Sequence, residues 1–582
     1  MLYYGNLLCY CHNINLMGGD ETATALELIR ENKTEELWQK CCGFIDLNIE
    51  QFMSIQYQLL LEQIELLNKC ELGEQVMRGA RPHSVEEFRR QVPLTTYSDY
   101  APFLPERMEE ALPEKPMLWQ RTSGRSGAGE FSCKWVPITA RTYRELGDAF
   151  MALLLFASGK GKGDVAYDEH DKFLYALAPP PYASGCWAHR LDEEGVFDFL
   201  PPVLEAESMD FQKRIEEGFR MALSEGIDMM AAIASVLVAV GERFGQGGSM
   251  SRIISMLNKP GLLLRLLKAV LKSKLAQRSL LPRDVWSLKG LVSSGTDSNI
   301  YREKIKEMWG RYPLDIYGAT ESVIISMQTW DYADMTFVPN LNFLEFIPEA
   351  DYSKWYQDRN YRPLILMLDE VMPGNRYVVI ITSFLGGAFV RYVLDDIITI
   401  TSLRNEKLNI NIPQMSFYGR ASDIIDFAAF THAFLTEKMV WQAVANSGCD
   451  YVDWVARKEA QKDTPVLCVY IELKADDSHK EEELTTLIHE QLKLLNQDYR
   501  ELEDFFGFKP LKVILLHEGA FTNYRTVMQA SGADLAHLKP PHMNPPDKVV
   551  EILTGEKVPS VPTPSDGAVI ETPARPDSSP PD

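Results

Sequence analysis

The residues best suited to chemistry begin with a loop rich in glycine and hydroxyl groups. Residues 121–130 read Arg-Thr-Ser-Gly-Arg-Ser-Gly-Ala-Gly-Glu. Glycines let the backbone approach a phosphate closely, and hydroxyl and free backbone N–H groups can donate hydrogen bonds to its oxygens. The residues predicted to hold phosphate are Thr122, Ser123, Gly124, Ser126 and Gly127. A flexible surface loop has a similar composition, so the segment alone leaves both interpretations open.

Two better-known motifs nearly fit this loop but are disfavoured. Gly124 and Gly129 have the spacing of a P-loop, but Glu130 stands where that motif requires a lysine. A carboxylate there would repel the phosphates. Ser126 lies at the centre of a near nucleophile elbow, but Ala128 replaces its final glycine and no histidine is obviously placed to serve it. The sequence therefore favours neither a P-loop NTPase nor a serine hydrolase.

A second candidate segment is the turn Tyr317-Gly318-Ala319-Thr320-Glu321, which follows a predicted strand. A threonine hydroxyl and a glutamate carboxylate at a strand end can hold a phosphate and its Mg²⁺. A plain surface turn is the alternative.

Three later segments complete the set. Asp395-Asp396 lies in a predicted hairpin turn, where an acid can accept hydrogen bonds from ribose hydroxyls or simply face solvent. Gly419-Arg420 falls at an apparent domain boundary, and Lys539 stands near the end of the predicted folded part. Each segment alone is weak evidence for a nucleotide site. The order and spacing of the five segments along the chain carry more information.

In order and spacing, these five segments resemble the adenylate-forming superfamily, which includes acyl-CoA ligases, synthetase adenylation domains and luciferases. Within it, the closest resemblance is to the Gretchen Hagen family of auxin-responsive acyl acid–amido synthetases and their bacterial relatives. The segments that resemble this family are Ser84–Arg89, Val92–Tyr97, Lys134–Pro137, Leu280–Pro282 with Trp286, Ser293–Gly295 and Asn342–Pro348.

The resemblance implies a reaction and a set of site residues. ATP and Mg²⁺ are the implied cofactors. A small carboxylic acid is the implied substrate, and an amine or amino acid would accept the acyl group from the acyl-adenylate. Lys539, Thr320 and Glu321 are the implied catalytic residues, with Glu321 as the metal ligand. Beyond the loop residues named above, the implied nucleotide contacts are Lys134, Ser294, Gly295, Tyr317, Gly318, Ala319, Asp396 and Arg420.

Two other functions remain open. An acyl-CoA ligase would use the same first half-reaction, with the thiol of coenzyme A in place of the amine. A non-catalytic descendant would bind nucleotide or a partner without releasing pyrophosphate.

Charge and cysteine usage restrict the class of protein further. The formal net charge of −23 argues against nucleic acid as the main partner, because binding phosphate backbones needs a basic face. The nine cysteines contain no C-x-x-C pair, and the N-terminus lacks the basic region of a signal peptide. The most apolar stretch, Met229–Val240, is too short to span a bilayer. We therefore expect a cytoplasmic protein without an integral membrane segment.

A basic, leucine-rich helix is predicted at Leu262–Leu275. Such a helix can lie on a membrane surface. More often it buries its leucines against the protein body, and that is the expectation here.

Helical segments alternate with short apolar runs, which predicts an α/β fold. Helical spacing is found in residues 20–110, 142–155 and 211–280. The predicted strands are 173–177, 290–293 and 314–317, followed by short antiparallel ones at 343–347, 377–382, 389–393 and 397–401. We expect a large N-terminal α/β domain with mostly parallel sheets and a small β-barrel-like subdomain. A smaller, mobile α+β domain should follow at the C-terminus.

The predicted boundaries follow changes in composition. Residues 1–20 are a possible N-terminal extension, with Met17 as a candidate start. The adenylate-forming domain is predicted at 21–418, with its β-rich subdomain at about 335–418, and the C-terminal lid at 419–548. Residues 549–582 are rich in proline, serine and acids and are predicted to be a disordered tail.

Overall fold

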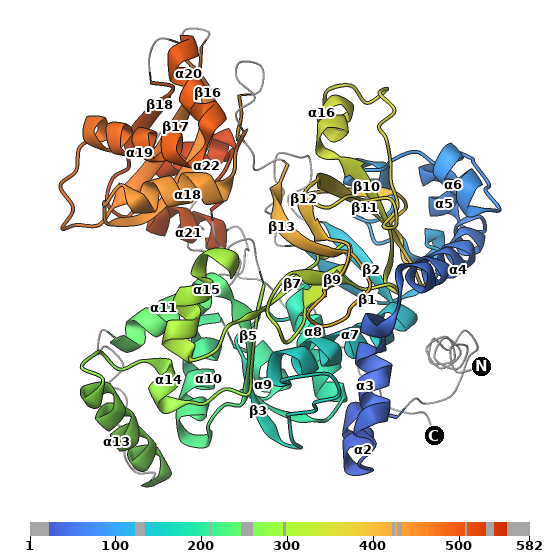
Figure 1. The fold of residues 1–582 in the computed structure, drawn as a ribbon, viewed down its shortest axis with the longest axis horizontal. Coiled ribbons are helices and arrows are strands. Elements are labelled where there is room, and N and C mark those ends of the chain that lie inside the picture. The colour runs from blue at the N-terminus through green and yellow to red at the C-terminus, as the bar shows by residue number, and fades with distance from the viewer. Residues whose placement is uncertain are drawn as a thin grey trace, which may run out of the picture.

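One eleven-stranded sheet forms the centre of the molecule (Figure 1). The computed structural model describes residues 23–122, 134–209, 211–245, 260–294, 298–421, 425–427, 434–461, 464–506, 509–530 and 540–555. The strand order is β10-β11-β12-β13-β9-β8-β7-β6-β5-β3-β4. The predicted α/β fold, with a large sheet and a separate C-terminal part, is confirmed.

Five strands at one end of this sheet are parallel. They are β3 (Asp171–Tyr175), β4 (Phe197–Leu200), β5 (Met229–Ile233), β6 (Gly290–Ser294) and β7 (Leu314–Tyr317). Neighbouring residues of β3 enter different cores, because Phe173 and Tyr175 belong to one cluster and Leu174 to the other. Helices cover both faces, as parallel sheets require. Those that contact its strands are α7 (Ala140–Ser158), α8 (Ala183–Glu193), α10 (Phe211–Glu225) and α11 (Ala234–Gly245). Outside them, α9 (Val203–Glu207) packs on α8, α15 (Ser298–Trp309) packs on α11, and α14 (Pro282–Val285) packs on α15.

The prediction of helix for the whole of 211–280 is wrong at β5. This strand lies between β3 and β6 in the parallel sheet, and its residues are mostly buried. A strand covered on both faces has a continuous apolar run instead of an alternating one, so its period does not distinguish it from a helix.

The other half of the sheet is antiparallel, as the runs after Asp334 predicted. Its strands are β8 (Ser326–Gln328), β9 (Met335–Phe337), β10 (Asn342–Pro348), β11 (Arg376–Ser383), β12 (Tyr392–Ser402) and β13 (Gln414–Arg420). These strands continue the large sheet through β7 and β8. Two helices, α4 (Ile49–Leu67) and α16 (Glu349–Gln357), pack against β10.

The predicted turn at Asp395-Asp396 is wrong, because both residues lie inside β12. The strand is bulged there. Val378 of β11 pairs with Ile397, whereas Ile380 pairs with Val393. Asp395 has φ +65°, a conformation that aspartate tolerates better than most residues. The run of acids therefore marks a β-bulge instead of the end of a strand.

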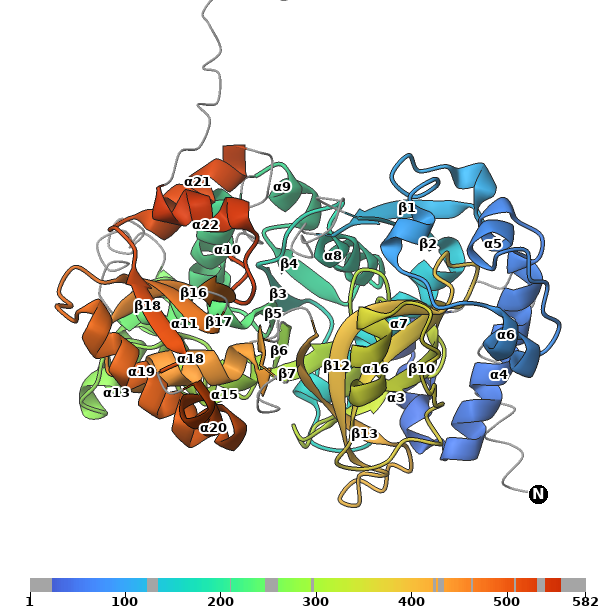
Figure 2. The same ribbon diagram turned by 90° about the horizontal axis from the view of Figure 1, so that it is seen from above.

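The C-terminal part has its own three-stranded sheet, made of β16 (Tyr451–Gln461), β17 (Thr464–Leu473) and β18 (Leu511–Leu515). Two hydrophobic clusters pack around it. Figures 1 and 2 show it in orange to red beside the large sheet. Its helices are α18 (Glu437–Asn446), α19 (Glu481–Leu495), α20 (Gln497–Phe506), α21 (Ala520–Ala530) and α22 (Asp547–Thr554).

Helix α22 corrects the predicted start of the tail. Residues 549–554 were assigned to a disordered segment but form most of this helix. Val550, Ile552 and Leu553 are buried in a cluster that also contains Phe521 of α21. This apolar face packs against the rest of the cluster, so the folded part of the chain extends at least to Thr554. Residues 1–22 and 556–582 lie outside the described chain.

The remaining elements lie outside the eleven-stranded and three-stranded sheets. Near the N-terminus these are α2 (Ala25–Arg30), α3 (Thr34–Cys42), α5 (Glu71–Val76), α6 (Val85–Gln91) and the hairpin of β1 (Pro116–Arg121) and β2 (Trp135–Thr139). A short pair, β14 (Ile425–Asp426) and β15 (Phe434–Leu435), precedes α18. Among the described residues, no helix combines the length and apolar character needed to cross a membrane.

The basic leucine-rich segment forms helix α13 (Pro260–Leu275), as predicted. The expectation that its leucines are buried is wrong for Leu267, Leu271 and Leu275, which are exposed. Only one side of the helix faces α10 and α14. Leucines at adjacent positions point to different sides of a helix, so some must face away from the body.

Candidate active site

The base of the glycine- and hydroxyl-rich loop is closed by two predicted site residues. Thr122 directly follows β1, and Lys134 directly precedes β2. The Thr122 backbone N–H donates to the Lys134 carbonyl over 2.9 Å, and the Lys134 backbone N–H donates to Thr122 Oγ1 over 2.9 Å. Ser123, Gly124, Ser126 and Gly127 lie outside the described residues. The hairpin of β1 and β2 therefore fixes the two ends of the loop that contains these residues.

The turn after β7 is unusually tight. A Cβ atom on Gly318 would lie 2.0 Å from the Val323 carbonyl oxygen, so a larger residue would require the backbone to move. The Val323 N–H donates to the Ala319 carbonyl over 2.7 Å, and Ser322 Oγ accepts from the Ala319 N–H over 2.8 Å. This compact turn carries Thr320 and Glu321 at the carboxyl end of β7, an edge where α/β proteins commonly bind ligands.

Lys134 and Glu321 meet at the centre of the site. Lys134 Nζ lies 2.8 Å from Glu321 Oε1 and donates to Tyr392 Oη over 3.0 Å. The Tyr392 hydroxyl in turn donates to Glu321 Oε1 over 3.2 Å. The Lys134 ammonium also lies 5.5 Å from the centre of the Tyr97 ring. Three distant segments therefore place a cation, a carboxylate and a phenol together.

The Lys134 charge holds Glu321 in its ionised form. Burial alone would raise the pKa of this carboxyl group, and it is the largest influence on it. The adjacent ammonium opposes burial through its charge and its hydrogen bond. Together with smaller contributions from a backbone N–H and Arg420, this leaves the pKa of Glu321 below its ordinary value.

A second cluster contains Tyr317, Asp396 and Arg420. The Tyr317 hydroxyl donates to Asp396 Oδ2 over 3.1 Å, and Arg420 Nε lies 3.3 Å from Asp396 Oδ1. Asp396 and Arg420 are paired residues of β12 and β13. Burial raises the pKa of Asp396 to about 6, although Arg420 and the tyrosine hydrogen bond both act to lower it.

These residues fit the groups that the resemblance implies. Asp396 Oδ1 is buried and accepts no hydrogen bond from any residue the structure describes. A ribose hydroxyl would supply a donor for it. Mg²⁺ usually binds proteins through one or two carboxylates, with substrate phosphates and waters as its other ligands. Lys134 and Tyr392 both contact Oε1 of Glu321.

The other predicted residues are placed only in part. Ser294 ends β6, where it pairs with Ile316 of β7, the residue before Tyr317. Gly295 and Lys539 lie outside the described residues.

The segment directly after Lys539 is attached to the free edge of β16. The Ala456 N–H donates to the His542 carbonyl over 2.6 Å, and the Asn544 N–H donates to the Ala456 carbonyl over 2.8 Å. The His542 ring stacks on Trp454, with Nδ1 2.7 Å from Glu437 Oε1 and Nε2 2.9 Å from Asp453 Oδ1. A neutral imidazole has only one N–H, so the imidazolium form satisfies both contacts.

Three residues near the predicted ones had no role in the sequence analysis. Tyr97 and Tyr392 lie in segments that were singled out, but neither tyrosine was assigned to the site. His542 lies three positions after Lys539 and was not noted. The signal available for each was its closeness in sequence to a candidate residue.

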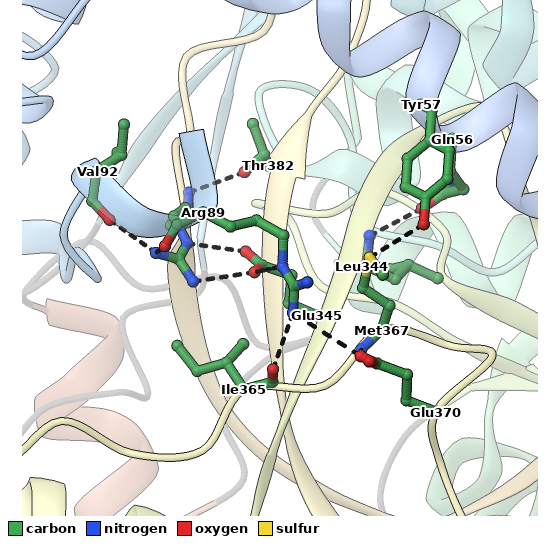
Figure 3. A network of polar contacts seen from close by, with 11 residues as sticks. Gln56, Tyr57, Arg89, Val92, Leu344, Glu345, Ile365, Met367, Glu370 and Thr382 are labelled. Atoms are coloured by element: carbon green, nitrogen blue, oxygen red, sulfur yellow. Dashed lines mark hydrogen bonds and ion pairs between the residues drawn. The ribbon is translucent and has the colours of Figure 1, made fainter. Parts of the chain in front are cut away.

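A buried ionic network supports the strands that carry the site (Figure 3). The Arg391 guanidinium donates to both carboxylate oxygens of Glu345, each over 2.9 Å. It also donates to the carbonyl oxygens of Arg89 and Val92, both over 2.7 Å. Arg89 Nε donates to Glu345 over 3.1 Å. The network joins the region around α6 to β10 and to the residue before Tyr392.

An apolar cavity lies between the parallel strands and helices α7 and α8. Its lining includes Val292 and Ser293 of β6 and Ile316 of β7, directly before Ser294 and Tyr317 in the chain. Its volume is about 40 Å³. No charged side chain is among the lining residues. The others are Phe150, Leu153, Leu154, Phe173, Leu177, Trp187, Ala188, Leu191, Phe199, Ala231 and Ala232.

Fold and site together define an α/β protein with a polar site at the carboxyl ends of parallel strands. Solved structures of the GH3.15 acyl acid amido synthetase share this fold. One in complex with 2,4-DB has a TM-score of 0.60 and 15% identity, and the match covers 89% of this chain and 96% of the other.

The family is then shown by sequence. The GH3 family N-terminal domain matches residues 42–177, its central domain 335–420 and its C-terminal domain 436–547. Together these matches cover more than half of the chain, which belongs to the GH3 family. The resemblance drawn from the motifs is confirmed.

Two curated plant proteins match over shorter stretches. The 4-substituted benzoates-glutamate ligase GH3.12 of Arabidopsis thaliana is 24% identical over 38% of this chain and 38% of its own length. The probable indole-3-acetic acid-amido synthetase GH3.1 of Oryza sativa subsp. japonica is 23% identical over 38% of this chain and 35% of its own length. The match thus spans little more than a third of each relative.

Proposed function

We propose that the protein is an ATP-dependent acyl acid–amido synthetase. It activates a carboxylic acid as an acyl-adenylate and then passes the acyl group to an amine. The observation that carries this proposal is the clustering of Lys134, Glu321 and Asp396, from three distant segments, in a chain of the GH3 family. The named relatives form amides, and Asp396 Oδ1, which accepts no hydrogen bond from the described residues, suits a nucleotide sugar.

In the first half-reaction, the acid's carboxylate oxygen attacks the α-phosphorus of ATP and pyrophosphate leaves. Positioning and neutralisation of charge are the main requirements of such a transfer. Thr122, Thr320 and the loop residues Ser123, Gly124, Ser126 and Gly127 would bind phosphate. Bound at Glu321, Mg²⁺ would neutralise phosphate charge.

The other proposed nucleotide contacts hold the adenosine side. Asp396 accepts from the ribose, and Arg420 helps to orient it. Tyr317 fixes the Asp396 carboxylate through its hydroxyl. The wall of the nucleotide site next to them is formed by Ser294, Gly295, Gly318 and Ala319.

Two lysines act at the phosphates. Lys134 stabilises the charge of the phosphates, and Lys539 stabilises the negative charge that develops as pyrophosphate leaves.

In the second half-reaction, the amine nitrogen attacks the acyl carbonyl carbon and the bond to AMP breaks. The nitrogen loses a proton and an amide forms. No covalent bond to the enzyme is needed. Movement of the C-terminal domain about residues 420–423 would admit the acceptor, and the closed domain would exclude water beforehand. We propose that this domain extends over 419–548, as the sequence predicts, with α22 as an addition.

The apolar lining of the cavity matches the body of an organic acid in chemistry, but its volume of about 40 Å³ requires the surrounding side chains to move before an aryl or indolyl group can enter. Its lining includes Ser293 and Ile316, which directly precede Ser294 and Tyr317 in β6 and β7. Its uncharged lining disfavours acids with a second ionised group, because burial of an unpaired charge is costly. We propose a monocarboxylic acid with an apolar body.

The test is acid-dependent ATP–pyrophosphate exchange with aryl, indolyl and fatty acids and, for comparison, dicarboxylic acids. Exchange with a monocarboxylic acid that is strongly reduced in Lys539→Ala supports the first half-reaction. Amino acids and coenzyme A are then compared as acceptors, and the proposal expects amide. Formation of a thioester would refute the proposal that an amine is the acceptor. Binding of ATP without exchange would refute the proposal that the protein adenylates an acid.

A further inference from the structure

In one part of this acidic protein, every charged residue is basic. Residues 243–283 contain nine lysines and arginines and no aspartate or glutamate, in a chain whose net charge is −23. Helix α13 lies in the middle of this stretch. Figures 1 and 2 both place it at the edge of the molecule.

The outward side of α13 carries leucines between lysines. Leu267, Leu271 and Leu275 are spaced by four residues, so they follow one face, and they are 59%, 61% and 78% exposed. At about 100° per residue, Lys274 lies on one side of this leucine row and Lys268 and Lys272 lie on the other. All three lysines are exposed.

The opposite side of α13 holds it on the protein. Leu266, Ala269 and Ser273 are buried. Arg265 donates to the carbonyls of Ala222 and Leu223 at the end of α10, over 3.3 and 2.9 Å. The outward face is therefore presented by a helix that is already folded and anchored, and binding there need not order a flexible segment.

We propose that α13 docks the protein onto a membrane surface that contains anionic lipid. The leucine row would enter the boundary between headgroups and acyl chains, and the lysines would reach the lipid phosphates. Charge complementarity identifies this occupant, because a lysine-flanked leucine row is attracted to anionic headgroups while the remaining acidic surface is repelled. The helix lies on the bilayer and does not cross it.

Protein partners fit the face less well. Lysine is depleted in the cores of protein interfaces, and here three lysines border three leucines. Symmetric pairing of two copies through α13 would bring like charges together. A lipid surface accommodates the lysines, because their long stems can extend to the headgroup level.

The experiment is co-sedimentation of the full chain with vesicles. Vesicles of phosphatidylcholine with roughly 30 mol % phosphatidylserine are compared with vesicles of phosphatidylcholine alone. We expect binding to the anionic vesicles, weakened by salt. The triple change Lys268→Gln, Lys272→Gln and Lys274→Gln should lower partitioning about a hundredfold. Changing Leu267, Leu271 and Leu275 to serine should also abolish detectable binding.

The matched control changes Leu204, Leu364 and Leu494 to serine, since these leucines are also exposed but lie on other segments. This variant should bind vesicles like the parent. Equal binding to both kinds of vesicle, or equal loss in the control, would overturn the proposal. So would a parent that self-associates in solution through α13, shown by light scattering as a loss of mass in the Leu267, Leu271 and Leu275 variant. None of these readouts depends on catalysis.

Discussion

Lys134 Nζ lies 2.8 Å from Glu321 Oε1, although 187 positions separate the two residues in the chain. One residue closes the base of the hydroxyl-rich loop, and the other belongs to the turn after β7. Glu321 is the proposed metal ligand, so the ammonium both keeps its carboxylate ionised and competes for it. Bound phosphate gives Lys134 a second anionic partner, which would free the carboxylate for Mg²⁺.

The first prediction concerns Lys134→Met. Loss of the ammonium should lower acid-dependent pyrophosphate exchange by about 10²–10³-fold, the effect typical of removing a group that stabilises transition-state charge. It should also let burial raise the pKa of Glu321. Lys115→Met, at an exposed position, is the control. An unchanged exchange rate in folded Lys134→Met would assign the residue a purely structural role.

The second prediction concerns the pH dependence of ATP binding. Because the pKa of Asp396 is raised to about 6, its carboxylate gains a proton as the pH falls through that value. A neutral carboxyl is a weaker acceptor for ribose hydroxyls. The KM for ATP should therefore rise below pH 6, and Asp396→Asn should have a high KM without this inflection. Persistence of the inflection in the variant would assign it to another group.

Protonation of the same carboxyl group should weaken ATP binding but stabilise the folded protein. Its pKa in the unfolded chain is about 3.9. Between roughly pH 4 and pH 6 the folded state therefore binds a proton that the unfolded state does not. Through Asp396, the free energy of unfolding should increase as the pH falls across this window. Denaturant titrations of Asp396→Asn at several pH values should show that this contribution is missing.

Local patterns were sufficient for several elements of the fold. The strand predicted at 314–317 has the bounds of β7, and the strand predicted at 290–293 matches β6 to within one residue. In both, a short apolar run is bounded by polar or turn-forming residues. By contrast, the chain at Met229–Ile233 is apolar in every position, and its strand conformation depends on the neighbours β3 and β6. The strand conformation of this segment therefore depends on tertiary contacts, which the local sequence pattern does not show.

The sequence predicts the motifs of the site one by one. It does not predict which side chains of different motifs contact one another. Lys134, Glu321 and Asp396 could be selected by resemblance, and their roles remain proposals. No local pattern reveals that Tyr392 joins Lys134 to Glu321, or that Asp395 occupies a bulge. Both features depend on the register between β11 and β12, which long-range packing fixes.

The fourth prediction treats His542 as a positioning residue for the segment that carries Lys539. His542→Gln removes an imidazole ring held between Glu437 and Asp453. We expect kcat for the exchange reaction to fall about 10–100-fold, because a small displacement of the lysine misaligns it. The KM for ATP should stay near its parental value. The exposed His517→Gln is the control, and a changed KM with an unchanged kcat would contradict this role.

The last prediction tests the network below the site. Glu345→Gln leaves Arg391 buried without its carboxylate partner. Removing one partner of a buried ion pair commonly costs about 3–5 kcal/mol, and urea unfolding of the large domain should show a loss of this size. Glu349→Gln breaks the more exposed pair with Arg376 and should cost about 1 kcal/mol or less. If both variants lose the same small amount, the Arg391–Glu345 pair is not what holds β10 to the region around α6.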